Sequence, residues 1–214
     1  MTFSILTFDP KARIFAAGSA TGNLCVGGWV LKGDARYGLV ASQGALPSTL
    51  WGEDVIELMS QGISASNAIN NIVSKDDGRE HRQISAIDTS GRSGIFSGSQ
   101  NLPEICHIQE ENLIASGNIL ENSAVLKEMC NAFKDKQGAL EHRILNSLKK
   151  ALEAGGDKRG LISASILILS LNAPPISLRI DYSVDPLKDL ERLIQKCNEP
   201  SYQNWIKELP TRNT

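Results

Sequence analysis

The order of extended and helical segments constrains this fold most. Short runs with strand character fill residues 3–43, and a second block of such runs fills residues 83–116. A pair of helical patterns follows each block, and these patterns lie at 53–61, from Ser64 to about Ile72, at 123–133 and at 139–154. Because each strand block is followed by a helix pair, the pattern predicts two stacked sheets covered by helices on the outside.

The first block predicts four strands in succession. Phe3–Phe8 and Ile14–Ala20 are separated by the turn-forming stretch Asp9–Ala12, which indicates a hairpin. Two further strands are expected at Cys25–Leu31 and Tyr37–Gln43. We expect these four consecutive strands to form an antiparallel sheet.

The last part of the chain predicts two more strands and a helix. Ser163–Leu171 is a continuous apolar run that is too short for a membrane and typical of a strand buried on both faces. Leu178–Asp181 is expected to pair with it, and a last helix begins after Asp185-Pro186. We therefore expect one domain over residues 1–198 and a C-terminal tail over 199–214. The fold class is then a four-layer α/β/β/α sandwich of two stacked, mainly antiparallel sheets.

The charge balance argues against two classes of partner. The 214-residue chain carries 22 Lys and Arg against 24 Asp and Glu, for a net charge of -2. It has no basic excess to meet a phosphate backbone or an anionic membrane, so we expect neither nucleic acid nor a membrane as partner. The N-terminus has no basic segment followed by a long apolar stretch, which predicts a cytoplasmic protein.

Common cofactor and metal signatures are missing from the sequence. It contains no Gly-x-Ser-x-Gly, Gly-x-x-x-x-Gly-Lys or His-Glu-x-x-His motif, and no Gly-x-Gly-x-x-Gly after a strand. The histidines and cysteines are scattered, at His81, His107 and His142 and at Cys25, Cys106, Cys130 and Cys197. Cys106 and His107 are neighbours, but in a strand their side chains point to opposite faces. We therefore expect no metal and no cofactor.

Thr2 is the strongest candidate for a catalytic nucleophile. It directly follows Met1, and removal of Met1 would make Thr2 the first residue. Its free α-amine, with a pKa of about 8, could then take the proton of its own hydroxyl, so that one residue supplies both base and nucleophile. A retained Met1 would block this amine. The alternative is that Thr2 is only a β-branched residue at the start of an edge strand.

A set of short motifs supports the chemical interpretation of Thr2. In chain order they are Thr2-Phe3-Ser4-Ile5, Ser42-Gln43 with Trp51-Gly52, Arg82-Gln83 before Asp88 and Gly91, Ser116-Gly117-Asn118 with Leu120, Gly155-Gly156-Asp157-Lys158-Arg159-Gly160 with Ser163-Ala164, and Leu178-Arg179-Ile180-Asp181 before Asp185-Pro186. Together they resemble a bacterial family known as domain of unknown function 1028, which is grouped with the N-terminal-nucleophile (Ntn) hydrolases. The resemblance runs from Thr2 to about Leu193. It implies an α/β/β/α sandwich and hydrolysis of amide bonds, without an assigned substrate.

The chain departs from the family pattern at two places. Ser42 stands where family members usually have Thr, which is a mild change. Ile105-Cys106-His107 stands near a place where members have an aromatic-Ala-Gly stretch, and this change could reshape one wall of the pocket.

An N-terminal nucleophile needs polar groups around its hydroxyl. Asn118 is the candidate oxyanion donor, and the alternative for Gly117-Asn118 is a simple turn or helix cap. Asp157 and Arg159 could form an ion pair that positions the amine; the alternative is a purely structural pair or loop cap.

Three further polar residues lie at the ends of predicted strands. Ser19, Gln43 and Ser163 could bind the nucleophile or the substrate, or could satisfy local backbone. Arg82 and Arg179 could meet a substrate carboxylate, but a structural salt bridge is the favoured interpretation.

The leading hypothesis is an N-terminal-nucleophile amidohydrolase that cleaves a small amide or peptide-like bond through Thr2, with a small-molecule amide as substrate. Cys25 is the next nucleophile to consider if Thr2 is not used. The alternative function is an inactive sandwich domain that binds a small molecule or a partner without turnover. We also expect a homo-oligomer.

Overall fold

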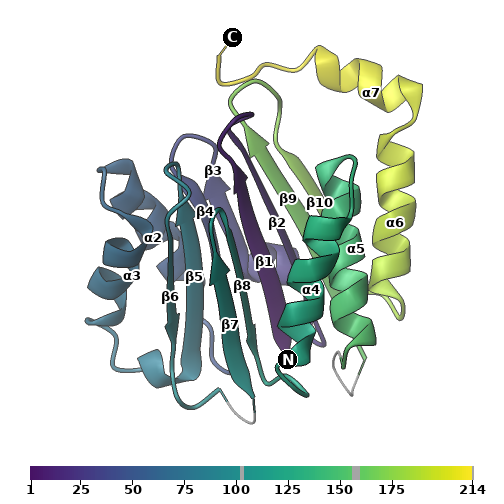
Figure 1. Ribbon diagram of the computed structural model, residues 1–214. Coiled ribbons are helices and arrows are strands. Elements are labelled where there is room, and N and C mark those ends of the chain that lie inside the picture. The colour runs from purple at the N-terminus through teal and green to yellow at the C-terminus, as the bar shows by residue number, and fades with distance from the viewer. Residues whose placement is uncertain (102–103, 156–159, 214) are drawn as a thin grey trace.

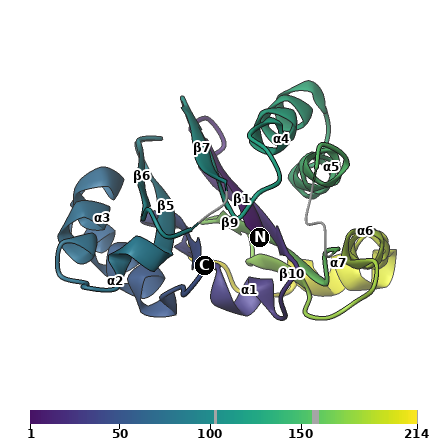
Figure 2. The same cartoon turned by 90° about the horizontal axis from the view of Figure 1, so that it is seen from below.

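The structure of the protein is a computed structural model that describes residues 1–101, 104–155 and 160–213. Two antiparallel sheets lie face to face between two layers of helices (Figures 1 and 2). The six-stranded sheet has the order β10 (Ile176–Ile180), β9 (Ser163–Ser170), β2 (Ile14–Thr21), β1 (Thr2–Asp9), β8 (Leu113–Asn118) and β7 (Ile105–Glu110). The four-stranded sheet has the order β3 (Leu31–Asp34), β4 (Gly38–Gly44), β5 (Arg82–Asp88) and β6 (Ser93–Ser97). The prediction of two stacked antiparallel sheets with helices is confirmed.

The helices cover the outer faces of the two sheets, as Figure 2 shows from one end of the strands. The four-stranded sheet is covered by α2 (Thr49–Ser60) and α3 (Ala65–Val73), and the six-stranded sheet by α4 (Ala124–Asp135), α5 (Leu140–Glu153) and α6 (Pro186–Cys197). The remaining helical elements are the short α1 (Val26–Trp29), the 3-10 turn η1 (Arg79–His81) and α7 (Pro200–Lys207), which lies in the segment expected to be a C-terminal tail.

The side-chain alternation of the strands builds three apolar layers, one between each pair of neighbouring layers of the sandwich. Along β1, Phe3 and Ile5 pack toward the helices α4 and α5, whereas Leu6 and Phe8 pack toward the other sheet. A third apolar layer joins β4 and β5 to α2 and α3. Successive side chains of a strand point to opposite faces, so central strands such as β1, β2 and β4 each contribute to two of these layers. The prediction that the strand at 163–171 is buried on both faces is confirmed.

The first four strands do not share one sheet, so that interpretation of residues 3–43 is wrong. The hairpin β1–β2 belongs to the six-stranded sheet, and β3 and β4 belong to the four-stranded sheet. The second block is divided in the same way, because β5 and β6 extend the small sheet and β7 and β8 extend the large one. Alternation of polar and apolar residues specifies which face of a strand is buried, but not which sheet the strand joins.

The strand expected at Cys25–Leu31 is also wrong, because its centre is the helix α1. Cys25 has left-handed backbone angles (φ 59°), and Gly27 packs against β9 and β10 so closely that a Cβ atom would lie 2.8 Å from Cβ of Ser165. The helical turn carries the chain from β2 in one sheet to β3 in the other. Among the described residues, no helix combines the length and the apolar character needed to cross a membrane.

Candidate functional site

The space between the two sheets is apolar at one end and polar at the other. In β1 the side chains that face this space change from Phe8 and Leu6 to Ser4 and Thr2. The polar end holds the start of β1, and Figure 2 views the molecule from that end. Buried polar side chains cost free energy unless they are paired, so such a concentration of them marks a candidate site.

Strand register brings the polar residues into rows across the sheets. In the six-stranded sheet one row contains Asn118, Thr2, Thr21 and Ser163, and the next contains Ser116, Ser4, Ser19 and Ser165. In the four-stranded sheet the facing row contains Gln43, Gln83 and Ser97. Directly opposed residues of antiparallel strands point to the same face, so all these side chains meet between the sheets.

Thr2 lies beside Thr21 at the edge of this polar region. Their Oγ1 atoms are 3.0 Å apart, and Oγ1 of Thr21 donates to the carbonyl oxygen of Met1 at 2.6 Å. Because the single proton of the Thr21 hydroxyl is used in this way, the hydroxyl of Thr2 is the donor to Thr21. Met1 itself is 5% exposed and packs in the apolar layer beneath the helices.

Gln43 ties the start of β1 to the other sheet. Its Nε2 donates to the carbonyl oxygen of Thr2 at 3.3 Å and to Oε1 of Gln83 at 2.8 Å, while its Oε1 accepts from Oγ of Ser4 at 2.6 Å. Both protons of its amide are therefore engaged within the protein. Gln43 was expected either to bind the nucleophile or substrate or to satisfy local backbone, and the structure places it in contact with the backbone of Thr2.

Gln83 and Ser19 complete the network below Thr2. Nε2 of Gln83 lies 3.0 Å from Oγ of Ser97 and 3.1 Å from the carbonyl oxygen of Gly117, so it joins three strands. Oγ of Ser19 is fully buried, 2.9 Å from Oγ of Ser4. Ser19 therefore supports the network from beneath and has no direct path to a ligand. Sequence reasoning missed the roles of Gln83 and Thr21, because only their cross-strand neighbours reveal them.

Asn118 is the directly opposed neighbour of Thr2 on β8. Its side chain is 1% exposed, and within the described residues neither Nδ2 nor Oδ1 has a hydrogen-bond partner. The next residue, Ile119, has φ of 56°, an unfavourable left-handed conformation for a β-branched side chain. Position 117 requires a glycine, because a Cβ atom on the helix side of the sheet would lie 2.7 Å from Cδ1 of Leu120. The alternative of a simple turn or helix cap at 117–118 therefore finds no support, since these residues end strand β8 and the cap of α4 is Ser123.

Ser163 holds the segment that forms one wall of the site. Its Oγ donates to the carbonyl oxygen of Asn23 at 2.7 Å and accepts from the backbone nitrogen of Val26 at 3.1 Å. The interpretation that Ser163 satisfies local backbone is thus the one the contacts support. Asp157 and Arg159, the predicted ion pair, lie outside the described residues.

An open cleft of about 460 Å³ leads from the surface to Thr2. Thr2, Thr21 and Gln43 contribute polar groups to it. Its walls are the segments 23–30, which includes α1, and 44–47. A nucleophile at this position would be accessible to a small molecule.

The two arginine candidates are engaged in ion pairs, and the thiol of Cys106 is a weak nucleophile. Nε of Arg82 lies 2.7 Å from Oδ2 of Asp76, and Nη2 of Arg179 lies 3.0 Å from Oδ1 of Asp181, so the prediction of structural salt bridges is confirmed. Burial raises the pKa of the Cys106 thiol to about 11. Such a thiol carries little thiolate at neutral pH and is a weak nucleophile.

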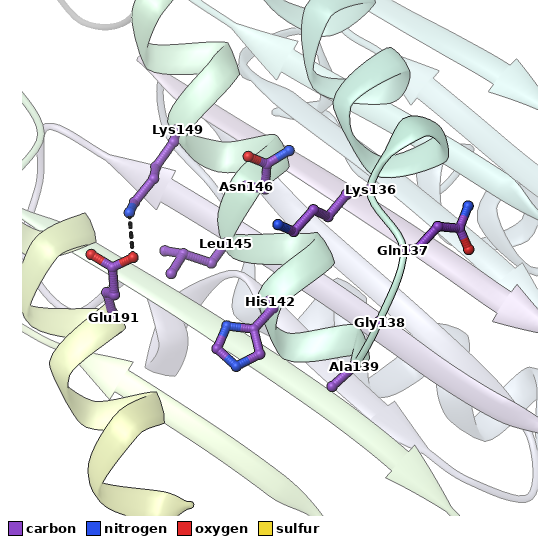
Figure 3. Close-up of a pocket in the computed structure, with 9 residues that line it drawn as sticks. All are labelled: Lys136, Gln137, Gly138, Ala139, His142, Leu145, Asn146, Lys149 and Glu191. Carbon is purple, nitrogen blue, oxygen red and sulfur yellow. Dashed lines mark hydrogen bonds and ion pairs between the residues drawn. The ribbon is translucent and has the colours of Figure 1, made fainter.

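A second pocket, of about 290 Å³, lies in the helical layer (Figure 3). It is lined by α5, α6 and the segment 136–139, and Nζ of Lys149 forms an ion pair with Glu191 at 2.7 Å across it. It lies on the helix-covered face of the six-stranded sheet, opposite the face on which Thr2 opens. The described residues contain no group of three or more His, Cys, Asp or Glu side chains placed to hold a metal ion.

Comparisons with known proteins assign the chain to a family. No curated protein matches it significantly. A crystal structure of protein SPO2555 from Silicibacter pomeroyi, itself attributed to DUF1028, superposes with a TM-score of 0.95 at 42% sequence identity and covers 99% of this chain and 92% of that chain. The model of the family of unknown function DUF1028 matches residues 2–190. The chain therefore belongs to the family of unknown function DUF1028.

Proposed function

We propose that this protein is an N-terminal-nucleophile amidohydrolase that becomes active when Met1 is removed, with Thr2 as the nucleophile. The observation that carries the proposal is the position of the Thr2 hydroxyl, which lines an open cleft and is hydrogen-bonded to Thr21 beside a buried polar network. The four-layer arrangement of helices and sheets supports it, because the resemblance to Ntn hydrolases implies the same architecture.

The chemistry requires only one residue with two functional groups. Once Met1 is lost, the α-amine of Thr2 has a pKa of about 8 and can accept the proton of Oγ1. Oγ1 attacks the carbonyl carbon of the amide, the carbon–nitrogen bond breaks, and the proton passes from the α-amine to the leaving nitrogen. A water molecule then attacks the resulting ester, gives one proton to the amine, and releases the acid with the hydroxyl of Thr2 restored.

Asn118 supports the proposal as the donor to the negative charge that develops on the carbonyl oxygen. An unpaired buried amide costs about 1–3 kcal/mol, and Asn118 carries this cost in the directly opposed position to Thr2. A carbonyl oxygen seated at Thr2 would satisfy Nδ2 of Asn118, and would do so best when it carries charge.

Thr21 and Gln43 hold the nucleophile. Removal of Met1 removes the carbonyl oxygen that accepts from Oγ1 of Thr21, so the Thr21 hydroxyl is released next to the new α-amine and Oγ1 of Thr2. Gln43 retains its bond to the carbonyl oxygen of Thr2 and fixes the strand. These residues position Thr2, whereas Thr2 and Asn118 are proposed to contact the reacting atoms; Asn118 is buried beside the residues that line the cleft and is directly opposed to Thr2.

One observation favours a second function, binding without turnover. Met1 is buried in an apolar layer, and its carbonyl oxygen accepts a short hydrogen bond from Thr21. If Met1 is retained in the native protein, the nitrogen of Thr2 is an amide and cannot act as a base. The same cleft would then only bind its ligand.

The experiment that separates the two functions begins with the intact mass of the protein purified from its native cells. We expect the mass that corresponds to loss of Met1. The processed protein is then assayed with a panel of small amides, beside Thr2→Ala and Thr2→Ser. We expect turnover by the wild type, partial turnover by Thr2→Ser and none by Thr2→Ala, with all three equally folded. Complete retention of Met1, or equal turnover by Thr2→Ala, would overturn the proposal.

A further inference from the structure

The lining of the Thr2 cleft is divided into a polar base and apolar walls. Three of the nine exposed large apolar side chains of the described residues line this one cleft: Leu24, Trp29 and Leu46, which are 51%, 54% and 61% exposed. Scattered exposed apolar residues are ordinary on a protein surface, but a group of them around a cavity indicates a binding surface. The apolar walls therefore point to a ligand with an apolar part.

The described residues that line the cleft include no ionisable side chain. Arg82, which contacts one wall from outside the lining, has its donors engaged, because its Nε bonds Asp76 and its Nη1 donates to the carbonyl oxygen of Leu46. On the other wall Arg179 packs under α1 and pairs with Asp181. A charged ligand group at the apolar walls would lose its hydration without gaining an opposite charge from the wall residues.

Both walls are held in place before a ligand binds. The wall formed by residues 23–30 is fixed by two sets of hydrogen bonds. The backbone nitrogen of Ser42 donates to the carbonyl oxygen of Val30, and Oγ of Ser163 bonds the backbone at Asn23 and Val26. In the wall formed by residues 44–47, the backbone nitrogen of Leu46 donates to the carbonyl oxygen of His81 at 3.1 Å. A pre-formed wall requires little ordering when a ligand binds, which favours affinity for one shape of group.

We propose that the cleft selects an uncharged amide that carries an apolar side chain, about the size of leucine or phenylalanine, next to the reacting carbonyl. This inference rests on the proposed function for the orientation of the ligand, since Thr2 defines where the carbonyl lies. The apolar side chain packs between Trp29 and Leu46, and the amide reaches the polar base at Thr2. The cleft volume of about 460 Å³ is sufficient for one such group.

The test measures binding, so it does not depend on turnover. Wild-type protein is titrated by calorimetry with N-acetyl-phenylalaninamide and N-acetyl-leucinamide, and with the charged N-acetyl-lysinamide and the amide of N-acetyl-glutamate. The variant Trp29→Ala is compared with Trp205→Ala, because Trp205 is also 54% exposed but lies on α7, away from the cleft. We expect the two neutral amides to bind more tightly than the charged ones, Trp29→Ala to weaken their binding about tenfold, and Trp205→Ala to leave it unchanged.

The outcomes distinguish this inference from the proposed function. Selective binding of neutral apolar amides without any hydrolysis supports the inference and overturns the amidohydrolase. Hydrolysis with a preference for charged amides supports the amidohydrolase and overturns the inference. Equal affinity for all four compounds, or equal effects of Trp29→Ala and Trp205→Ala, also overturns it.

Discussion

The hydroxyl oxygens of Thr2 and Thr21 lie 3.0 Å apart on adjacent strands of the six-stranded sheet. The two residues are directly opposed in the register of β1 and β2, so the backbone of the sheet sets this distance. A nucleophile at the start of a chain would otherwise be free to move. If Thr2 becomes the first residue, as proposed, its pairing with Thr21 would hold it at a fixed position in the cleft.

Replacing Thr21 by valine tests this relationship. The change keeps the shape of the side chain and removes the hydroxyl, so we expect kcat of the processed enzyme to fall by about 10- to 100-fold with little change in KM. Thr21→Ser should restore most of the rate. Steady-state kinetics on an amide substrate measures both parameters.

Thr7→Val is the matched control for Thr21→Val. Thr7 is also a buried threonine of the β1–β2 pair, and its Oγ1 donates to the carbonyl oxygen of Ala16 at 3.2 Å. It lies toward the far end of β1 from Thr2. Both variants should lose about 1 kcal/mol of stability for the missing hydrogen bond, but only Thr21→Val should lose activity. A similar loss of kcat in both would show that the effect is structural.

Replacing Gln83 by leucine should destabilise the fold. The change leaves Nε2 of Gln43 without its acceptor on Gln83 and removes the donor to the carbonyl oxygen of Gly117. We expect a loss of about 1–3 kcal/mol in the free energy of unfolding, measured by urea denaturation. Gln109→Leu, on an exposed position of β7, should change stability by less than about 0.5 kcal/mol. Equal effects of the two changes would mean that the buried network contributes little.

The same substitution at Asn118 should have the opposite effect on stability. Asn118→Leu removes two buried polar atoms that have no partner within the described residues, so the free energy of unfolding should stay the same or rise, by up to about 2 kcal/mol. Turnover should be lost, because the donor to the carbonyl oxygen is gone. Thermal unfolding and an amidase assay on the same preparation measure the two effects. A variant that is destabilised and still active would contradict the role assigned to Asn118.

The sequence predicted the local structure better than the site. The alternation of apolar and polar residues located most strands, and Thr2, Gln43 and Asn118 were identified as site candidates. It could not show that β3 leaves the sheet of β1, because pairing between strands depends on contacts distant in the chain. For the same reason Thr21, which is 19 residues from Thr2, was not recognised.

Some glycines marked positions where the chain packs closely, but the sequence did not show which neighbour each one packs against. Gly117 belongs to one of the motifs that carry the family resemblance, and in the structure it makes room for Leu120 on the helix side of the sheet. The paired glycines Gly27 and Gly28 were included in a strand, although they allow α1 to pack against Ser165 and Arg179. A glycine marks a close approach in the sequence but does not identify the neighbour.

The salt bridge between Asp76 and Arg82 should make the free energy of unfolding depend on pH in the acid range. The hydrogen bond from Arg82 holds the pKa of the Asp76 carboxyl below its ordinary value of 3.8. A carboxyl whose pKa is lower in the folded state stabilises the fold at pH values above its unfolded pKa, and this contribution disappears as the pH falls through the folded pKa. Because both side chains are partly exposed, we expect Asp76→Asn to cost less than about 1 kcal/mol at pH 7.

The acid dependence is tested by measuring unfolding of wild type and Asp76→Asn between pH 7 and pH 2. The difference between them should be constant down to about pH 4 and should then diminish toward zero. Asp77→Asn, at the exposed neighbouring position, should match the wild type throughout. Arg82 also donates to the carbonyl oxygen of Leu46, so loss of the salt bridge should weaken one of the contacts that hold this wall of the cleft. Binding of neutral apolar amides should therefore weaken in Asp76→Asn at pH 7, and unchanged binding would show that the wall is held by its backbone bonds alone.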